Sequence, residues 1–325
     1  MIATNRRWFI AAIIVLPLLL TVLIVNISVK PTLFRLELAG GILSADLQPS
    51  SIPDLPWTWR ANLVNQMHPR WKVPITTNEQ GFRTGIFTPK GERRRIVILG
   101  DSIMFGIRLI EDETLAGRLA RETNADIFNL GVPTYHLPQK MAVYEHFGRD
   151  LAPDLVILQM KPGDFIDRKP LMVSTWQRRI PLLLWIHYRL HRLGSRDGRR
   201  AAGLGAMHAW VDRLQADGTP LLVLYYPYLI TEFRTARWHQ DLADLQAMNL
   251  PLIDVGALLD ASGATITDYQ IAYGDLIHPN AQVQALTAAA IRTQANRFPS
   301  LKGSLPTAGE NDGPVFPSSA ETTSD

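Results

Sequence analysis

The fold is decided by the stretch Arg95-Ile-Val-Ile-Leu-Gly-Asp-Ser-Ile-Met-Phe-Gly106. Its first half predicts a short buried strand that ends at Gly100, and its second half leads through a turn into a helix-compatible segment. Asp101 and Ser102 would then stand at the carboxyl end of a strand, where ligands bind in open α/β sheets. Two interpretations are open. Ser102 is a nucleophile, or Asp101 or Ser102 merely caps the next helix, as these residue types often do.

Short apolar runs alternate with helix-length segments along the rest of the chain. This alternation predicts a parallel sheet with helices on both faces, which is an α/β fold. The further predicted strands are residues 125–131, 154–160, 220–226 and 250–255, and the predicted helices are residues 111–123, 139–148, 206–216, 234–248 and 279–297. No internal repeat is found in the sequence.

The composition excludes several classes of site. The 325 residues are 46% hydrophobic, which suits one large domain with appended segments, and the formal charge of +3 does not indicate binding to nucleic acid. The chain has no cysteine, so disulfides, thiolate metal sites and a lipidated cysteine are excluded. No phosphate-binding glycine motif follows Gly100 or Gly106. Seven of the eight histidines lack the spacing of metal ligands. We therefore predict no metal and no cofactor, and we regard His136 as a weak candidate for lining a pocket.

An apolar run at residues 8–25 follows Asn5-Arg6-Arg7 and is interrupted only by Pro17 and Thr21. About 20 apolar residues span a bilayer, and flanking arginines stay on the cytoplasmic side. This predicts one transmembrane helix, a cytoplasmic N-terminus and an extracytoplasmic main domain, which would be periplasmic in a Gram-negative cell. A cleaved signal peptide is the competing interpretation. We favour an uncleaved anchor, because residues 25–30 offer no clear small-x-small cleavage site.

The predicted organisation has four parts. Residues 1–29 are a cytoplasmic stub and anchor, and residues 30–77 are a spacer whose many prolines prevent a long helix. The tryptophans of this spacer either rest at the membrane interface or pack against the domain. Residues 78–298 form the main domain, and residues 168–202 are an insertion within it. Three interpretations of the insertion are open: an interfacial helix on the membrane, a cap over the active site, or part of the core. Residues 299–325 have the composition of a disordered tail.

A serine hydroxyl is a poor nucleophile until a base takes its proton, so a histidine must return to the same sheet edge. His278 has the best surroundings, in the segment Asp275-Leu-Ile-His-Pro-Asn280 before the last predicted helix, whose first turn suits Pro279. Asp275 can reach back to the imidazole, fix its tautomer and stabilise the imidazolium. Base and orienting carboxylate therefore arrive together, which favours the nucleophile interpretation of Ser102.

Four blocks resemble, in order and spacing, those of the SGNH (GDSL-like) hydrolase family, membrane-anchored bacterial type. They are Gly100-Asp-Ser102, Asn129-Leu-Gly-Val-Pro133, a strand ending near Asp164, and Asp275-x-x-His278-Pro. The likeness covers residues 78–297. It implies a flavodoxin-like three-layer α/β/α sandwich and ester chemistry at O-acyl groups. By this resemblance Ser102 would be the nucleophile, His278 the general base and acid, Asp275 its orienter, and the amides of Ser102 and Gly131 donors into an oxyanion hole.

The sequence departs from the family at the third block, which usually reads Gly-x-Asn-Asp and supplies an asparagine donor. Here the stretch is Lys161-Pro-Gly-Asp164, so Gly163 occupies the asparagine position. Losing one oxyanion donor typically costs about 10²–10³ in rate. The Gly163 amide is our candidate for the missing donor, with Lys161 or Asn129 as alternatives.

The predicted function is an extracytoplasmic serine ester hydrolase that removes O-acyl groups, chiefly O-acetyl, from cell-envelope or exopolysaccharide through an acyl-serine intermediate. An O-acetyltransferase of the same fold is the nearest alternative. The alternative from another functional class is a catalytically silent module that binds polysaccharide or helps assemble an export complex. Hydrolysis of lipids is a further alternative, with less support from the sequence. The predicted partners are an acylated glycan or other ester, the membrane, and a polysaccharide biosynthesis or export complex, but not nucleic acid.

Overall fold

The computed structural model describes residues 15–29, 47–52, 54–55, 57–166, 180–191 and 196–294. The predicted tail at residues 299–325 lies outside the described residues, as do much of the predicted spacer and the first part of the predicted insertion.

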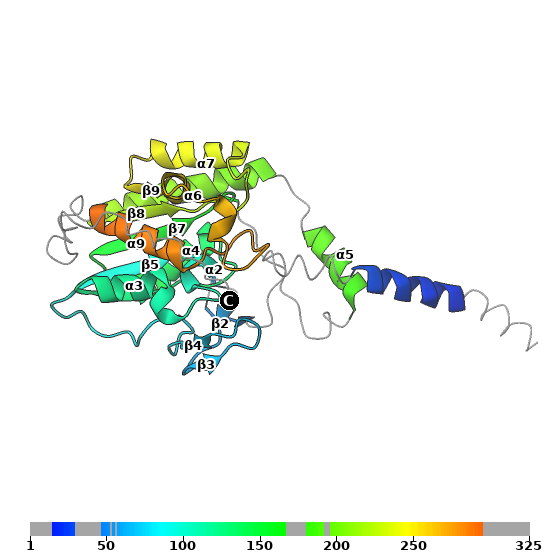
Figure 1. Ribbon diagram of the computed structural model, residues 1–325. Coiled ribbons are helices and arrows are strands. Elements are labelled where there is room, and N and C mark those ends of the chain that lie inside the picture. Colours follow the sequence, from blue (N-terminus) through cyan, green and yellow to red (C-terminus); the bar gives the residue numbers. More distant parts are fainter. Residues whose placement is uncertain are drawn as a thin grey trace, which may run out of the picture.

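Five parallel strands form the central sheet (Figure 1). They are β5 (Arg94–Leu99), β6 (Ala125–Asn129), β7 (Leu155–Met160), β8 (Leu221–Tyr225) and β9 (Leu252–Asp254). Their order is β6-β5-β7-β8-β9, so the first two are exchanged relative to the chain. This is the doubly wound order of flavodoxin-like folds, in which the direction of winding reverses beside the first strand. The predicted α/β fold with a parallel sheet is confirmed.

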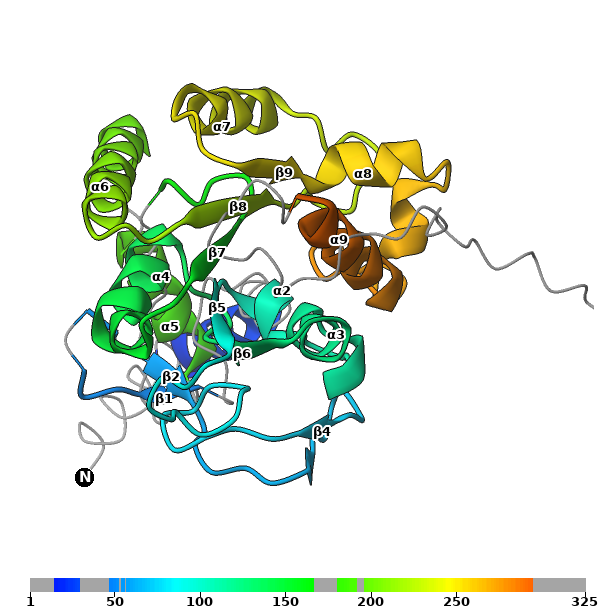
Figure 2. The ribbon, with the colours of Figure 1, turned by 90° about the vertical axis from the view of Figure 1, so that its left-hand side faces the viewer.

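Both faces of the sheet are buried, which explains why β8 is apolar throughout and β7 is apolar except at Gln159. In β5, Ile96 and Ile98 belong to one apolar cluster, whereas Val97 and Leu99 belong to the other. Figure 2 shows α4 and α6 on one side of the strands and α3 and α9 on the other. The helices of one face are α3 (Leu115–Glu122), α8 (Val255–Ala261) and α9 (Ala281–Gln294); those of the other are α4 (Leu137–Val143), α6 (Arg196–Ala216) and α7 (Ala236–Ala247). The molecule is thus a three-layer α/β/α sandwich.

Several elements differ from the sequence predictions. The predicted helix at residues 139–148 divides into α4 and the π-helical turn η2 (Tyr144–Gly148), which the 3₁₀ turn η3 (Arg149–Leu151) follows. The helix α6 begins within the predicted insertion. Neither α8 nor the 3₁₀ turns η1 (Glu111–Glu113) and η5 (Ile266–Tyr269) were predicted as separate elements, because such short segments carry little periodic signal.

The described part of the predicted spacer packs against the sandwich. It contains two antiparallel pairs, β1 (Leu47–Pro49) with β2 (Trp57–Trp59) and β3 (Gln66–Met67) with β4 (Pro74–Ile75). Trp57 and Trp59 are buried in the core. The Trp57 indole donates to the Pro133 carbonyl at 3.3 Å, and the Tyr135 hydroxyl donates to the Trp57 carbonyl at 2.6 Å. Of the two interpretations of these tryptophans, packing against the domain is therefore the one observed, and the packed domain begins before residue 78.

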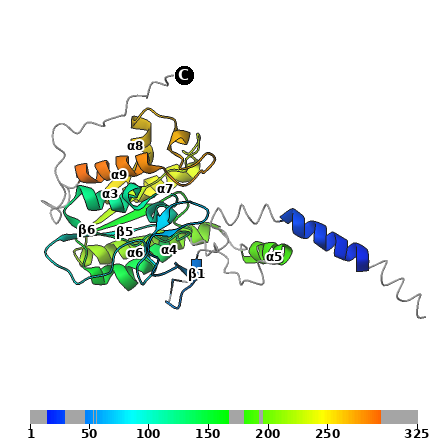
Figure 3. The same cartoon turned by 60° about the horizontal axis from the view of Figure 1, so that its bottom comes forward.

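Residues 15–29 form a helix that lies apart from the sandwich beside α5 (Pro181–His191) (Figures 1 and 3). The Leu182 amide of α5 donates to the Asn26 side-chain oxygen at 3.0 Å. Most apolar side chains of the 15–29 helix are exposed, with Leu16 at 70%. Within the described ranges, no helix has both the length and the apolar character needed to cross a membrane. Residues 8–14, the first part of the predicted apolar run, lie outside the described residues.

Candidate active site

Ser102 stands at the carboxyl edge of the sheet, directly after the turn that follows β5. It is the first residue of α2 (Ser102–Phe105), and the preceding Asp101 caps this helix by accepting the Ile103 amide at 2.9 Å. The cap and nucleophile interpretations therefore apply to different residues. Gly100 is required here, because a Cβ at this position would collide with the Met104 side chain. The chain can then turn back sharply and present the serine.

The structure brings Ser102, His278 and Asp275 into one chain of hydrogen bonds. His278 Nε2 lies 2.9 Å from Ser102 Oγ, and His278 Nδ1 lies 2.9 and 3.0 Å from the two Asp275 oxygens. This is the order nucleophile, base, orienting carboxylate that serine catalysis needs. The His278 and Asp275 side chains are 15% and 19% exposed, so the base end of this chain reaches the surface.

The Asp275 carboxylate is held in its ionised form. Burial raises the pKa of Asp275. Hydrogen bonds from the His278 ring and from the amides of Ile277 and His278 lower it by a larger amount, so the net pKa lies below the usual value. An ionised carboxylate at Nδ1 fixes the tautomer in which Nε2 can accept the serine proton.

The loop that carries the histidine is fixed at both ends. Gln270 pairs with Pro279 in an antiparallel bridge, and the Ile271 amide donates to the His278 carbonyl at 2.9 Å. Asn280 then caps α9 by accepting the amides of Gln282 and Val283. The base is therefore positioned by backbone contacts as well as by its carboxylate.

The predicted oxyanion donors are arranged differently from what the resemblance implies. The Gly131 amide donates to the Asn129 side-chain oxygen at 3.0 Å, and the Gly163 amide donates to Asp241 at 2.8 Å. Asn129 in turn donates to the Met104 carbonyl at 2.8 Å. Neither glycine amide is free for a substrate oxygen. The Ser102 amide, at the first position of α2, has no partner within its helix.

A group of buried and partly buried polar side chains lies directly behind the serine, and we call it the buried charge cluster. Lys161 bonds to Asp101 and to Asp164, the latter at 3.3 Å. Lys140 donates to Asp164 at 2.5 Å and to the Gln159 carbonyl at 2.7 Å. The members are Asp101, His136, Lys140, Gln159, Lys161 and Asp164.

Two carboxylates, Asp101 and Asp164, face the amino groups of Lys140 and Lys161 in this cluster. Burial lowers the pKa of Lys140, whereas its contact with Asp164 at 2.5 Å opposes that shift. Burial raises the pKa of Asp164, but the charges of Lys140 and Lys161 lower it by a larger amount. The pKa of Asp164 therefore lies well below the usual range. For Lys161, the carboxylates of Asp101 and Asp164 outweigh burial and raise its pKa above the usual value. Burial lowers the pKa of His136, which lies 3.3 Å from Asp164 and stays neutral at pH 7.

Sequence reasoning missed three residues that position this site. Lys140 and Gln159 belong to the buried charge cluster, yet a lysine in a predicted helix is typical of a solvated face. Arg83 is 1% exposed and donates to the carbonyls of Phe105, Gly106 and Leu109 at 2.8–3.1 Å. These hydrogen bonds fix the backbone at the end of α2 and in the segment that follows it. No local pattern around Arg83 distinguishes it from a surface arginine.

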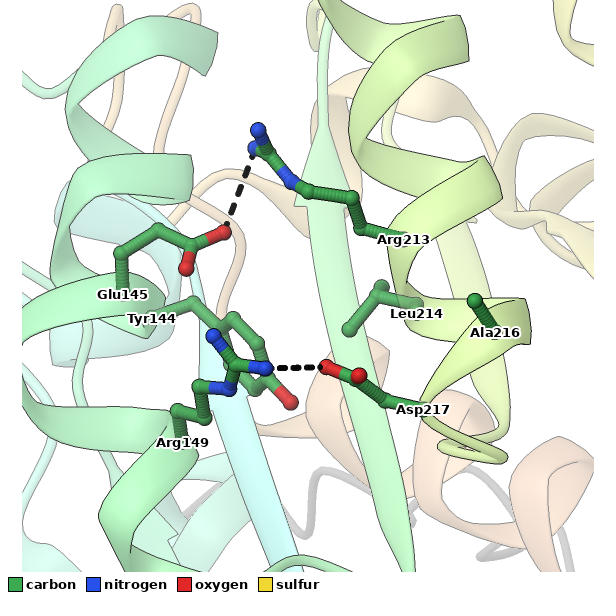
Figure 4. Close-up of a pocket in the computed structure, with 7 residues that line it drawn as sticks. All are labelled: Tyr144, Glu145, Arg149, Arg213, Leu214, Ala216 and Asp217. Carbon is green, nitrogen blue, oxygen red and sulfur yellow. Dashed lines mark hydrogen bonds and ion pairs between the residues drawn. The ribbon is translucent and has the colours of Figure 1, made fainter.

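A separate hollow of about 120 Å³ lies between α6 and the turns η2 and η3 (Figure 4). Its charged side chains are paired with one another: Arg213 with Glu145 at 3.2 Å and Arg149 with Asp217 at 2.9 Å. Asp217 lies shortly before β8 begins, so this hollow is at the amino edge of the sheet, opposite Ser102. It takes no part in the site.

In the part of the chain that is described, no three His, Asp or Glu side chains are grouped as metal ligands.

No family model matches the chain, and no curated protein matches it. Solved structures match it distantly. A lipase/acylhydrolase from Enterococcus faecalis is 18% identical over 66% of this chain and 99% of its own, with a TM-score of 0.41. A catalytic mutant of an acetylxylan esterase from Geobacillus stearothermophilus is 12% identical over 63% and 94%, with a TM-score of 0.44. A GDSL-like lipase from Bacteroides thetaiotaomicron is 12% identical over 65% and 92%, with a TM-score of 0.43. Similarity this distant says nothing of activity, so the site alone must support the function.

Proposed function

We propose that this chain is a serine ester hydrolase that removes O-acyl groups, chiefly O-acetyl, from a cell-envelope glycan or exopolysaccharide. One observation carries the proposal: Ser102 Oγ, the His278 ring and the Asp275 carboxylate form a continuous hydrogen-bonded chain with both links at 2.9 Å.

The geometry supports a two-step reaction. His278 Nε2 takes the proton of Ser102 Oγ as this oxygen attacks the ester carbonyl carbon, and the Ser102 amide donates to the resulting oxyanion. The intermediate collapses, the ester C–O bond breaks, and the leaving alcohol takes the proton from His278. Water then attacks the acyl-serine with His278 again as base, which releases the carboxylic acid and restores the serine. Asp275 stabilises the imidazolium in both steps.

The surroundings of the site support a glycan as substrate. Tyr273 is fully exposed two residues before Asp275, and Leu276 is 49% exposed on the same loop. An exposed aromatic ring combines an apolar body with a polar tip, which suits the mixed surface of a sugar ring. The triad also reaches the surface, which suits a polymeric substrate better than a deep, enclosed cavity would.

We also propose that residues 8–29 anchor the chain in a membrane, with the sandwich on the extracytoplasmic side and within reach of a polysaccharide biosynthesis or export complex. The exposed apolar side chains of residues 15–29 support this, because a helix that is apolar all round is stable when lipid surrounds it. On α5, Leu183 and Ile186 are 47% and 40% exposed and extend this apolar surface.

A catalytically silent binding module is the second candidate, and the engaged amides of Gly131 and Gly163 favour it. Labelling by a fluorophosphonate probe and acetate release from an acetylated oligosaccharide distinguish the two. We expect the wild type to be labelled and to release acetate, and Ser102→Ala to lose at least about 10³-fold of this activity. Ser50→Ala is the matched control, because the Ser50 hydroxyl accepts the Ile52 amide and is no member of the triad.

Equal activity in wild type and Ser102→Ala would overturn the proposal. A folded wild type that is neither labelled nor active would favour the binding module. If the acetyl group passes to an added sugar hydroxyl faster than to water, the protein is an O-acetyltransferase that uses the same acyl-serine.

A further inference from the structure

We propose that Lys161 is a catalytic residue of this site, and that its ammonium group donates to the oxyanion. The inference rests on the proposed ester hydrolysis and names a further donor for its oxyanion.

Lys161 lies next to the nucleophile because of the sheet topology. It follows β7 directly, and Ser102 follows β5; the two strands are paired, with Leu99 opposite Leu158. Both chains leave the sheet at its carboxyl edge, at the point where the winding reverses and ligands bind. The Lys161 ammonium bonds to the side chain of Asp101, the residue immediately before Ser102.

Of the two cations in the buried charge cluster, Lys161 is the one that reaches the surface. Its side chain is 12% exposed, whereas that of Lys140 is fully buried. An ammonium group has three N–H donors. Among the described residues Asp101 and Asp164 engage two of them, and Tyr228 is a further neighbour that raises the Lys161 pKa. The third N–H is the donor that we assign to the substrate oxygen.

The reaction needs this charge. When Ser102 Oγ bonds to the carbonyl carbon, the negative charge develops on the former carbonyl oxygen, near the buried carboxylate of Asp101. Like charges repel strongly where water is excluded. The amides of Gly131 and Gly163 are engaged elsewhere. The Ser102 amide is thus one donor, and Lys161 adds a second donor while it cancels the charge of Asp101.

The test compares Lys161→Met, which removes charge and donor, with Lys161→Arg, which retains both. Two quantities are measured: kcat and KM for an acetate ester, and the affinity of a boronic acid that forms a tetrahedral anion on Ser102. We expect Lys161→Met to lower kcat about 10²–10³-fold with little change in KM, and to weaken boronate binding by a similar factor. Lys161→Arg should retain part of both. Lys72→Met is the control, since Lys72 is exposed and outside the site.

The double variant Asp101→Asn/Lys161→Met separates donation from charge balance. It removes both members of the pair and avoids an uncompensated buried carboxylate, so it also serves if Lys161→Met fails to fold. We expect the double variant to stay impaired in kcat and in boronate affinity. Recovery of both to wild-type values would overturn the proposal and reduce Lys161 to a counterion.

If the wild type hydrolyses the ester while Lys161→Met retains full kcat and boronate affinity, this inference fails and the proposed function stands. If the wild type shows neither activity nor boronate binding, both fail.

Discussion

The Asp275 carboxylate determines which nitrogen of His278 carries the proton. Its two oxygens face Nδ1 at 2.9 and 3.0 Å, and the amides of Ile277 and His278 hold it in place at 3.2 and 3.1 Å. Because its pKa is lowered, the carboxylate stays charged as the pH falls from 7 to about 5, and protonation of Asp275 cannot limit activity in that range.

We expect Asp275→Asn to lower kcat about 10³–10⁴-fold with the structure intact. The amide of asparagine can donate to Nδ1, which favours the tautomer protonated at Nε2, and that nitrogen can no longer accept the Ser102 proton. Ester hydrolysis at pH 7 is the measurement. The control is Asp217→Asn, which disrupts only an exposed ion pair with Arg149. A loss of less than tenfold in Asp275→Asn would contradict the proposed role of the carboxylate.

At the residue scale, the sequence predicts the role of a side chain when its hydrogen-bond partner is close to it in the sequence. Asp275 and His278 are three positions apart, and their spacing already places the carboxylate at the imidazole. The direction of the Gly163 amide was not predictable in this way, because Asp241, 78 positions along the chain, decides it. Lys140 was missed for the same reason, since its partner Asp164 lies 24 positions along the chain, in the loop after β7.

At the element scale, α6 supports the loop that carries Lys161 from behind. Arg200 on α6 donates to Asp241 at 2.7 Å, and Asp241 accepts the Gly163 amide at 2.8 Å. Further along the helix, Gly203 lies against the Phe165 carbonyl. The strands β7 and β8 were predictable because burial on both faces makes them almost wholly apolar. The start of α6 was not, since its glycines lower the helix propensity of that segment.

Two glycines of α6 give a matched pair for testing this contact. A Cβ at Gly203 would collide with the Phe165 carbonyl oxygen, whereas one at Gly205 meets nothing within 4 Å. We expect Gly203→Ala to lower the free energy of unfolding by about 1–3 kcal/mol and to lower kcat, because the loop of Lys161 and Asp164 must shift. Gly205→Ala should raise the free energy of unfolding by about 0.5–1 kcal/mol with kcat unchanged. Denaturant unfolding and ester hydrolysis measure the two effects. Equal stability of the two variants would contradict the close packing of α6.

At the scale of the whole molecule, two apolar surfaces remain outside the sandwich. The helix of residues 15–29 and α5 meet where Asn26 accepts the Leu182 amide, near the start of α5. Val25, Ser28, Val29 and Trp185 line a hollow of about 300 Å³ between them. If the first helix lies in lipid, this contact places the beginning of α5 near the extracytoplasmic surface of the bilayer.

Because the chain has no cysteine, single cysteines can report where these helices lie. We expect an environment-sensitive fluorophore on Leu19→Cys or Leu183→Cys to show a blue-shifted emission when the full chain is placed in phospholipid nanodiscs, since both side chains would contact lipid. The control is Ile86→Cys, because Ile86 is 75% exposed on the sandwich and should report water. A water-like signal at Leu183 together with a lipid-like signal at Leu19 would confine the membrane contact to the first helix. A water-like signal at Leu19 would contradict the anchor itself, whereas the proposed chemistry of Ser102 would be unaffected, since the triad lies wholly within the sandwich and its loops.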